Sequence, residues 1–146
     1  MGRFRRVTLR PGVLRDEATV LRIRNEPGVA AEGLTSAPRG PGWFHAVEPF
    51  VHVIEGPTRN AGPMTVGYIL LESTAVISIA VSESYRGEGV GTLALQQALA
   101  RARGRECTRA LAWIRPGNAP SMAIFRAAGF CEQPRNRTVL HALALR

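Results

Sequence analysis

The segment Tyr85–Gly91, with the sequence YRGEGVG, places three glycines within five positions between a predicted strand and a predicted helix. The preceding residues, Ala75–Ser82, alternate apolar side chains between two faces, as a strand does. From Val90 to about Arg103, apolar residues recur at helical spacing. Glycine lets the backbone approach a ligand, and the first turn of a helix offers free N–H groups and partial positive charge. The segment therefore predicts an anion site, most naturally for phosphate.

The known phosphate-binding loops differ from this one. A Walker A loop ends in Gly-Lys-Ser/Thr, but all 19 basic residues of this chain are arginines. A dinucleotide fingerprint has glycines at offsets 0, 2 and 5. Counted from Gly87 the last position is Thr92, and counted from Gly89 it is Ala94. A plain tight turn against the sheet remains an alternative.

The rest of the chain alternates strand and helix patterns, with residues 28–49 read as a short helix or loop because of their glycines and prolines. The other predicted strands are Arg5–Pro11, Phe50–Glu55, Thr65–Glu72, Arg109–Ile114 and Arg137–Leu145, and the other predicted helices run from an Asp16 cap to about Asn25 and from Asn118 to Gly129. This order predicts one α/β (α+β) domain over residues 1–146 with a mixed sheet.

Composition narrows the class of protein. The net charge is +8, and Arg3, Arg5 and Arg6 form a basic cluster, as a nucleic-acid-binding module could have. The nine aromatic residues (five Phe, two Trp, two Tyr) are not interleaved with basic ones, so we expect no nucleic-acid partner. No apolar run suits a membrane span or a secretory signal, so the expected location is cytoplasmic. The two cysteines, Cys107 and Cys131, have no metal-binding spacing, and we expect no metal site.

Two motifs together carry a family resemblance. Arg86–Gly91 matches the pattern Arg/Gln-x-x-Gly-x-Gly/Ala, and Asn118–Phe130 matches Asn-x-x-Ser-x-x-x-aromatic-x-x-x-Gly-Phe. Together they resemble the GNAT superfamily of acetyl-CoA-dependent N-acetyltransferases. The resemblance implies a mixed sheet of about six to seven strands flanked by about four helices. It also implies that two central parallel strands splay apart to admit the pantetheine arm of acetyl-CoA, the cosubstrate.

The resemblance assigns roles to residues around the glycine segment. Loop amides of Arg86 to Thr92 would hold the CoA pyrophosphate, and backbone groups of Ile79–Val81 would pair with pantetheine. The Val81 N–H would polarise the thioester carbonyl, and Asn118 would cap its helix, contact the cofactor, or both. The implied cofactor-binding residues are Ile79, Ala80, Val81, Arg86, Gly87, Glu88, Gly89, Val90, Gly91, Thr92, Asn118 and Phe125.

The catalytic groups are less clear from the sequence. Many GNAT enzymes protonate the leaving thiolate with a tyrosine, but Phe125 stands at that position. A thiol with a pKa of about 8.5 can leave unprotonated, and Ser121 could assist or be a helix-surface serine. Candidate bases are His45, His52, Glu72, Glu83 and His141, with water as the alternative. His45 is favoured because it lies in the segment expected to form the acceptor pocket.

The expected reaction is acetyl transfer to a primary amine of a small molecule, such as an amino sugar or similar metabolite. The alternatives are a protein or peptide amine, and a catalytically silent CoA-binding domain. Arg22–Val29 (RIRNEPGV) weakly resembles a subgroup acting on amino-sugar nucleotides or ribosomal protein N-termini. Arg22 and Arg24 could equally be helix-surface charges. We also expect that a protein of this fold could form a homodimer through its C-terminal strands.

Overall fold

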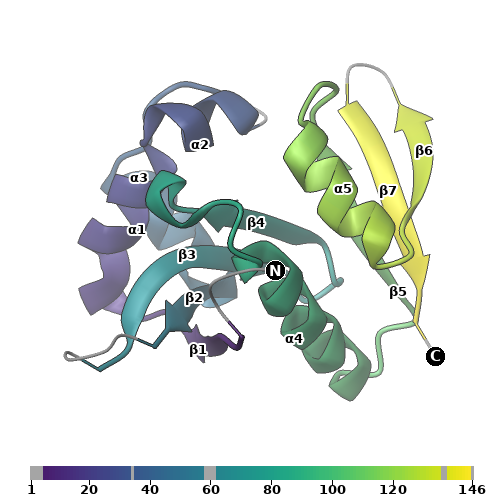
Figure 1. Cartoon of the computed structure of the whole chain (residues 1–146), viewed down its shortest axis with the longest axis horizontal. Coiled ribbons are helices and arrows are strands. Elements are labelled where there is room, and N and C mark those ends of the chain that lie inside the picture. The colour runs from purple at the N-terminus through teal and green to yellow at the C-terminus, as the bar shows by residue number, and fades with distance from the viewer. Residues whose placement is uncertain (1–4, 34, 58–61, 136–137, 146) are drawn as a thin grey trace.

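The computed structural model describes residues 5–33, 35–57, 62–135 and 138–145 (Figure 1). Its strands are β1 (Thr8–Pro11), β2 (Val51–Gly56), β3 (Met64–Leu71), β4 (Ile77–Val81), β5 (Arg109–Ile114), β6 (Cys131–Arg135) and β7 (Thr138–Ala144). Its α-helices are α1 (Glu17–Arg24), α2 (Pro27–Glu32), α3 (Pro41–Val47), α4 (Val90–Gly104) and α5 (Ala119–Ala127), with 3-10 turns at Leu14–Asp16, Glu48–Phe50 and Glu83–Tyr85. Within the described residues, no helix is long and apolar enough to cross a membrane.

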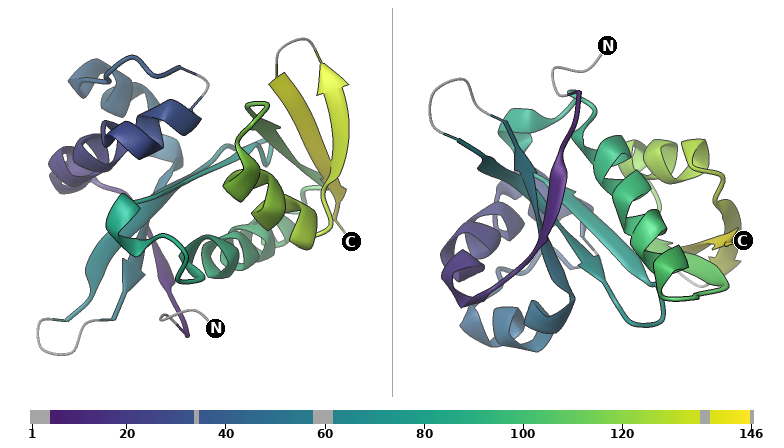
Figure 2. Two further views of the ribbon diagram at one scale, coloured as in Figure 1. Left: turned by 45° about the horizontal axis from the view of Figure 1, so that its top comes forward. Right: turned by 90° about the horizontal axis from the view of Figure 1, so that it is seen from below.

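The strands form two antiparallel sheets that meet along one short line. The first sheet has the order β1-β2-β3-β4 and the second has the order β5-β7-β6. Near the start of β4, Val76 forms a parallel bridge with Leu111, and the Leu111 N–H donates to the Ala75 carbonyl at 2.9 Å. Beyond this point the two strands diverge, and the sheets spread apart (Figure 2). The expected fold, a mixed sheet with splayed central strands, is confirmed.

Two apolar cores lie on opposite faces of the first sheet. Helix α4 buries a stripe that includes Ala94, Leu95 and Ala98 against Ile69 and Ile77. On the other face, α1 and α3 pack on β2 and β3 around residues such as Ile23 and Phe44. Because successive side chains of a strand point to opposite faces, β4 contributes residues to both cores. Ile77 belongs to the first core and Ala80 to the second. The shared sheet thus holds α1 and α4 in fixed positions on its two sides.

The structure also differs from the sequence predictions. The segment read as a short helix or loop, residues 28–49, instead holds α3 and all of α2 except its first residue, Pro27, and each helix has proline in its first turn. Strand β6 was not predicted, because its sequence CEQPR lacks alternation and contains a proline. It pairs antiparallel with β7, from Cys131 opposite Ala142 to Arg135 opposite Thr138. Part of the predicted last strand, Arg137, lies outside the described residues.

Asp16 precedes α1 as predicted, but its carboxylate does not cap the helix. It instead accepts hydrogen bonds from the Arg10 guanidinium at 2.9 and 3.1 Å and from the Val13 N–H at 2.8 Å. The hydrogen bonds from Arg10 hold the pKa of Asp16 below its usual value. This partly buried contact fastens β1 to the start of α1.

We expect Asp16→Asn to lower the free energy of unfolding by about 1–3 kcal/mol at neutral pH, because it breaks a charge-assisted contact. A depressed carboxyl pKa stabilises the fold above the unfolded pKa, and that stabilisation is lost as the pH falls through the folded value. The deficit of the variant should therefore shrink in urea unfolding below about pH 4. The exposed Glu72→Gln variant is the control. An equal deficit of Asp16→Asn at neutral and acidic pH would contradict this account.

Candidate active site

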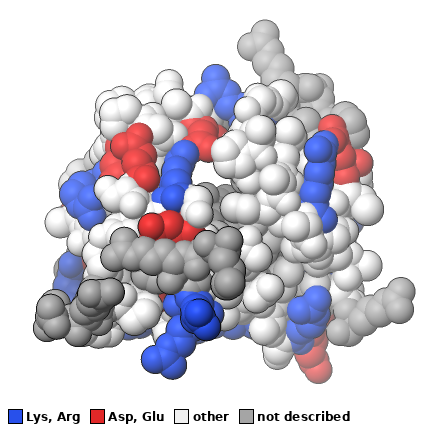
Figure 3. Space-filling view, viewed as in Figure 1, with Lys and Arg blue, Asp and Glu red and all other residues white. Residues whose placement is uncertain are grey.

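A cavity of about 720 Å³ opens where β4 and β5 part. This volume lies within the range of small-molecule sites. The cavity is lined by β4, the loop after it, the first turns of α4 and α5, and residues of the α1–α3 region. Figure 3 shows basic and acidic side chains interspersed around the hollow between the two halves of the molecule. The cavity is therefore bounded by elements from both halves of the chain.

The glycine segment forms one wall of this cavity. Gly87 and Gly89 have φ angles of +73° and +82°, and Gly89 is the N-cap of the 15-residue helix α4. Such angles favour glycine, and they turn the chain so that α4 starts at the cavity. Gly91 and Thr92 in the first turn also line it. Helix N-termini bind anions through their free N–H groups, so the predicted anion site has the required geometry.

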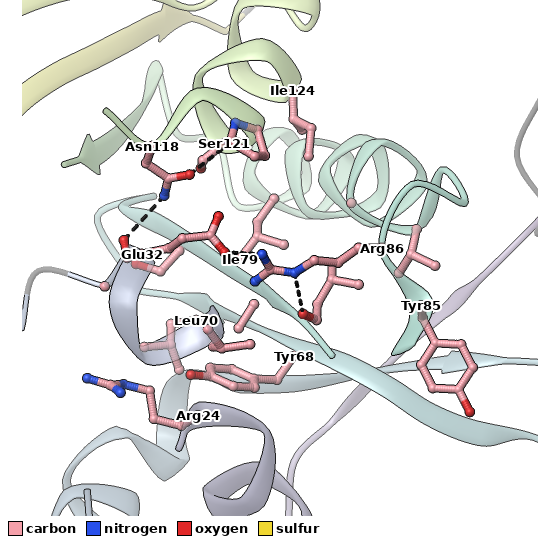
Figure 4. A pocket seen from close by; sticks show the side chains of 18 of the residues that line it. Arg24, Glu32, Tyr68, Leu70, Ile79, Tyr85, Arg86, Asn118, Ser121 and Ile124 are labelled. Atoms are coloured by element: carbon pink, nitrogen blue, oxygen red, sulfur yellow. Dashed lines mark hydrogen bonds and ion pairs between the residues drawn. The ribbon is translucent and has the colours of Figure 1, made fainter. Parts of the chain in front are cut away.

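The edge of β4 forms a second wall. The Ser82 N–H donates to the Val66 carbonyl at 2.9 Å, across the pairing with β3. Because backbone groups alternate along a strand, those of Ile79 and Val81 point the other way, into the cavity. Arg86 confirms this direction, since its Nε donates to the Val81 carbonyl at 3.3 Å (Figure 4). The splayed strand thus offers main-chain hydrogen-bonding groups to a ligand.

The C-terminal end of α2 spans the cavity and contacts both of its sides. Glu32 forms an ion pair with Arg86 of the glycine segment, and the Glu32 carbonyl accepts from Asn118 Nδ2 at 3.2 Å (Figure 4). Arg115, next to β5, donates to the Ala31 carbonyl at 2.8 Å. These contacts tie α2 to the two strands that part beneath it.

The turn between α1 and α2 is fastened to the end of β4 by two carboxylates. Glu26 accepts from the Ser82 hydroxyl and from the Glu83 N–H, each at 2.9 Å. Glu83 in turn accepts from the Gly28 N–H. Neither Glu26 nor Glu83 lines the cavity. Glu83, a candidate base in the sequence analysis, is engaged in holding this turn.

Asn118, Ser121 and Phe125 all line the cavity from the side of α5. The Asn118 side chain caps α5 by accepting from the Ser121 N–H at 3.3 Å, so its capping reading is confirmed. Phe125 is 2% exposed and packs edge-on against Phe130, with ring centroids 4.9 Å apart. The cavity therefore has an apolar ring where the resemblance would place a hydroxyl group.

The other predicted residues are distributed as follows. Ile79, Ala80, Val81, Arg86, Gly87, Gly89, Val90, Gly91 and Thr92 line the cavity, whereas Glu88 and His45 do not. His45 is exposed on α3, with its Nε2 atom 3.7 Å from the Glu17 carboxylate. Glu72 is exposed after β3 and also lies outside the lining.

The two buried histidines also lie away from the cavity lining. His52, on β2, has its pKa lowered by burial and by the charge of Arg101, and its Nδ1 lies 3.3 Å from the Phe50 carbonyl. Burial likewise lowers the pKa of His141 on β7. Among the described residues, none of the five candidate bases reaches the cavity.

Sequence reasoning missed the far end of the cavity, which Arg24, Arg39, Trp43 and Tyr68 line. Arg24 is 7% exposed, and its Nη2 donates to the Thr35 carbonyl at 2.6 Å, so the surface reading was wrong for Arg24 and right for exposed Arg22. Trp43 and Tyr68 pack edge-on with centroids 6.2 Å apart. Burial raises the pKa of Tyr68 well above its usual value. Its phenol therefore stays neutral further into the alkaline range than an exposed tyrosine does.

Comparison with known proteins agrees with this architecture. Residues 42–130 match the model of the acetyltransferase (GNAT) family. The match spans more than half of the chain, so the chain belongs to this family. Membership confirms, at the level of the family, the expected acyltransferase with acetyl-CoA as cosubstrate.

Individual relatives are more distant. YwnH of Bacillus subtilis (strain 168), provisionally named a phosphinothricin acetyltransferase, is 41% identical over 59 residues, which are 40% of this chain and 36% of that protein. A domain from Methanocaldococcus jannaschii DSM 2661 has a TM-score of 0.82 at 17% identity, covering 96% of this chain and 99% of that one. The yncA protein of Salmonella typhimurium, provisionally named an acetyltransferase and solved with acetyl-CoA, has a TM-score of 0.74 at 19% identity, covering 96% and 94%. The two structures support the fold.

The neutral state of Tyr68 can be tested by following tyrosinate absorbance against pH. Because burial disfavours the charged phenolate, we expect Tyr68→Phe and the parent protein to give the same titration curve up to about pH 11 while folded. The control is the same titration in denaturant, where the variant should show the absorbance change of one tyrosine fewer than the parent protein near pH 10. Loss of a titration step below about pH 11 in the folded variant would contradict the assignment.

Proposed function

We propose that this protein transfers the acetyl group of acetyl-CoA to a primary amine of a small molecule. The observation that carries the proposal is the cavity, which joins a helix N-terminus and an exposed strand edge to an end lined by aromatic rings. Helix α2 spans the cavity and is tied to both sides by Arg86, Arg115 and Asn118. A cavity spanned by a helix in this way suits a small amine better than a polypeptide.

The residues that fit acetyl-CoA follow from this geometry. The amides at the start of α4, from Arg86 to Thr92, would hold the diphosphate, with the Arg86 guanidinium as an added donor. The main-chain groups of Ile79 and Val81 would pair with the pantetheine arm as an added strand would. Asn118, fixed by its cap to α5, would contact the same arm. The thioester supplies the activated acetyl group.

The reaction needs few protein groups. The amine nitrogen forms a bond to the acetyl carbon and loses a proton, while the carbon–sulfur bond breaks and the sulfur gains a proton. The Val81 N–H faces the cavity and would stabilise the negative charge that develops on the carbonyl oxygen. Phe125 cannot donate a proton, so we propose that the thiolate, whose conjugate pKa is about 8.5, is protonated by water or by the Ser121 hydroxyl.

A catalytically silent CoA-binding domain is the second candidate, and Phe125 is the observation that favours it. A buried phenyl ring at this place offers no acid to the leaving group. The two candidates share the binding site and differ only in turnover. A screen of primary amines under saturating acetyl-CoA, followed by free thiol release, separates them. Calorimetric CoA binding without thiol release for any amine would favour the silent domain, and absence of CoA binding would overturn both.

We expect Arg86→Gln to weaken CoA binding about tenfold, because a guanidinium beside a diphosphate adds a charge-assisted contact. The salt dependence of binding should also become shallower. Isothermal titration calorimetry at two salt concentrations measures both effects. Arg103→Gln, in the exposed last turn of α4, is the matched control and should bind as the parent does. Equal affinities for the Arg86 and Arg103 variants would contradict the placement of the diphosphate.

A further inference from the structure

We infer that the acceptor amine carries a carboxylate or an equivalent oxyanion, which Arg24 and Arg39 bind at the aromatic end of the cavity. This inference rests on the proposed function and names the substrate class of the same site. It assigns Arg24 and Arg39 as specificity-determining residues. The ligand it describes is amino-acid-like, with a neutral amine directed at β4 and an anion directed at the two guanidinium groups.

The first argument is an unmet hydrogen-bonding requirement. Arg24 is only 7% exposed. One of its guanidinium nitrogens, Nη1, is buried without a hydrogen-bond partner among the described residues. The Nε atom of Arg39 is in the same condition. No carboxylate in the described part of the chain forms an ion pair with either guanidinium. The buried charge of Arg24 is costly unless an anion offsets it, and the half-buried Arg39 adds a second cation beside it.

The second argument is that the protein holds both arginines in place. Arg24 is anchored through its Nη2 atom, which donates to the Thr35 carbonyl at 2.6 Å. The backbone of Arg39 is held by Asn25, whose Oδ1 accepts from the Arg39 N–H at 2.8 Å and whose Nδ2 donates to the Arg39 carbonyl at 2.9 Å. These contacts occupy one side of each residue and leave donors for a ligand. The anchored Arg24 guanidinium, with Arg39 lining the same cavity, suits a planar carboxylate.

The third argument is the position of this pair relative to the reacting strand. Figure 4 shows Arg24 beside the Tyr68 ring, across the cavity from Asn118 and Ser121. Arg39 lines the same cavity, and burial raises the pKa of Tyr68 while the charges of Arg24 and Arg39 oppose that rise. Tyr68 is paired in register with Ala80 of β4. The Tyr68 backbone is thus one strand away from the edge that would hold the thioester, so we expect one small molecule to carry both the amine and the anion.

The surroundings also limit the rest of the ligand. Trp43, Tyr68 and Leu70 give this end of the cavity apolar walls. The carboxylate that lines the cavity here, Glu32, is already paired with Arg86. A second anion or an apolar side chain would therefore be accommodated more readily than a polycation. We therefore expect polyamines to be poor acceptors.

The test compares acceptors that differ only in the anion. The L-amino acids and their α-carboxamides are assayed by thiol release and titrated by calorimetry, both with CoA and without it. We expect kcat/KM for the best amino acid to exceed that of its amide by at least about 100-fold, because the amide leaves the guanidinium groups unmatched. Equal use of amides and acids overturns the inference. So does absence of binding and turnover for every amino acid.

Variants assign the effect to the two arginines. Arg24→Met should lower kcat/KM for the amino acid about 100-fold and that for its amide by less than about threefold, with the KM for acetyl-CoA unchanged. Arg39→Met should act in the same direction, which keeps the test informative if the Arg24 variant is unstable. Arg103→Met is the matched control and should match the parent. Loss of activity toward acid and amide alike, in a folded variant that binds CoA, would contradict the assignment.

The outcomes separate this inference from the proposed function. Failure to bind CoA would refute the proposed function, while the titration of amino acids without CoA still reports on the anion site. Binding of CoA with good turnover of uncharged amines, but not of amino acids, would refute the anion site and support the proposed function.

Discussion

The site depends on the separation of β4 from β5. A single parallel bridge, between Val76 and Leu111, joins the two sheets within the described residues. Beyond it, the backbone groups of Ile79 and Val81 have no neighbouring strand, although main-chain polar groups in a protein interior require partners. The pairing with β3 on the opposite side remains continuous from Gly67 to Leu71. The edge of β4 is therefore held rigidly while it stays open to a ligand.

The cavity that results has two chemically different ends, and α2 connects them. At one end Gly87 and Gly89 set the N-terminus of α4 against the cavity, where diphosphate charge would be stabilised. At the other end Arg24 lies among aromatic rings. The pairing of Glu32 with Arg86, and the bonds from Arg115 and Asn118, hold α2 across the middle. Binding at the two ends is thus organised by one short helix.

The sequence predicted the parts of the site that depend on local structure. The glycine segment, helix α4 and the cap at Asn118 could be predicted because each depends on residues that are close together in the sequence. The structure confirms all three. Arg24 entered only through a weak resemblance and Arg39 was not found, because their place at the cavity depends on packing between α1, the α2–α3 connection and β3. Strand β6 was also missed, since its residues pair with β7 without an apolar pattern of their own. Contacts between distant segments leave no such periodic signal.

The central claim is that the Ile79 and Val81 main chain is an open edge that acetyl-CoA completes. Amide hydrogen exchange, followed by NMR with and without CoA, tests it most directly. The account predicts that the Ile79 and Val81 amides exchange quickly in the free protein and become strongly protected when CoA binds, while the Ser82 amide, already bonded to Val66, changes little. Protection of all three amides before CoA is added, or no change at Ile79 and Val81 when CoA binds, would contradict the account.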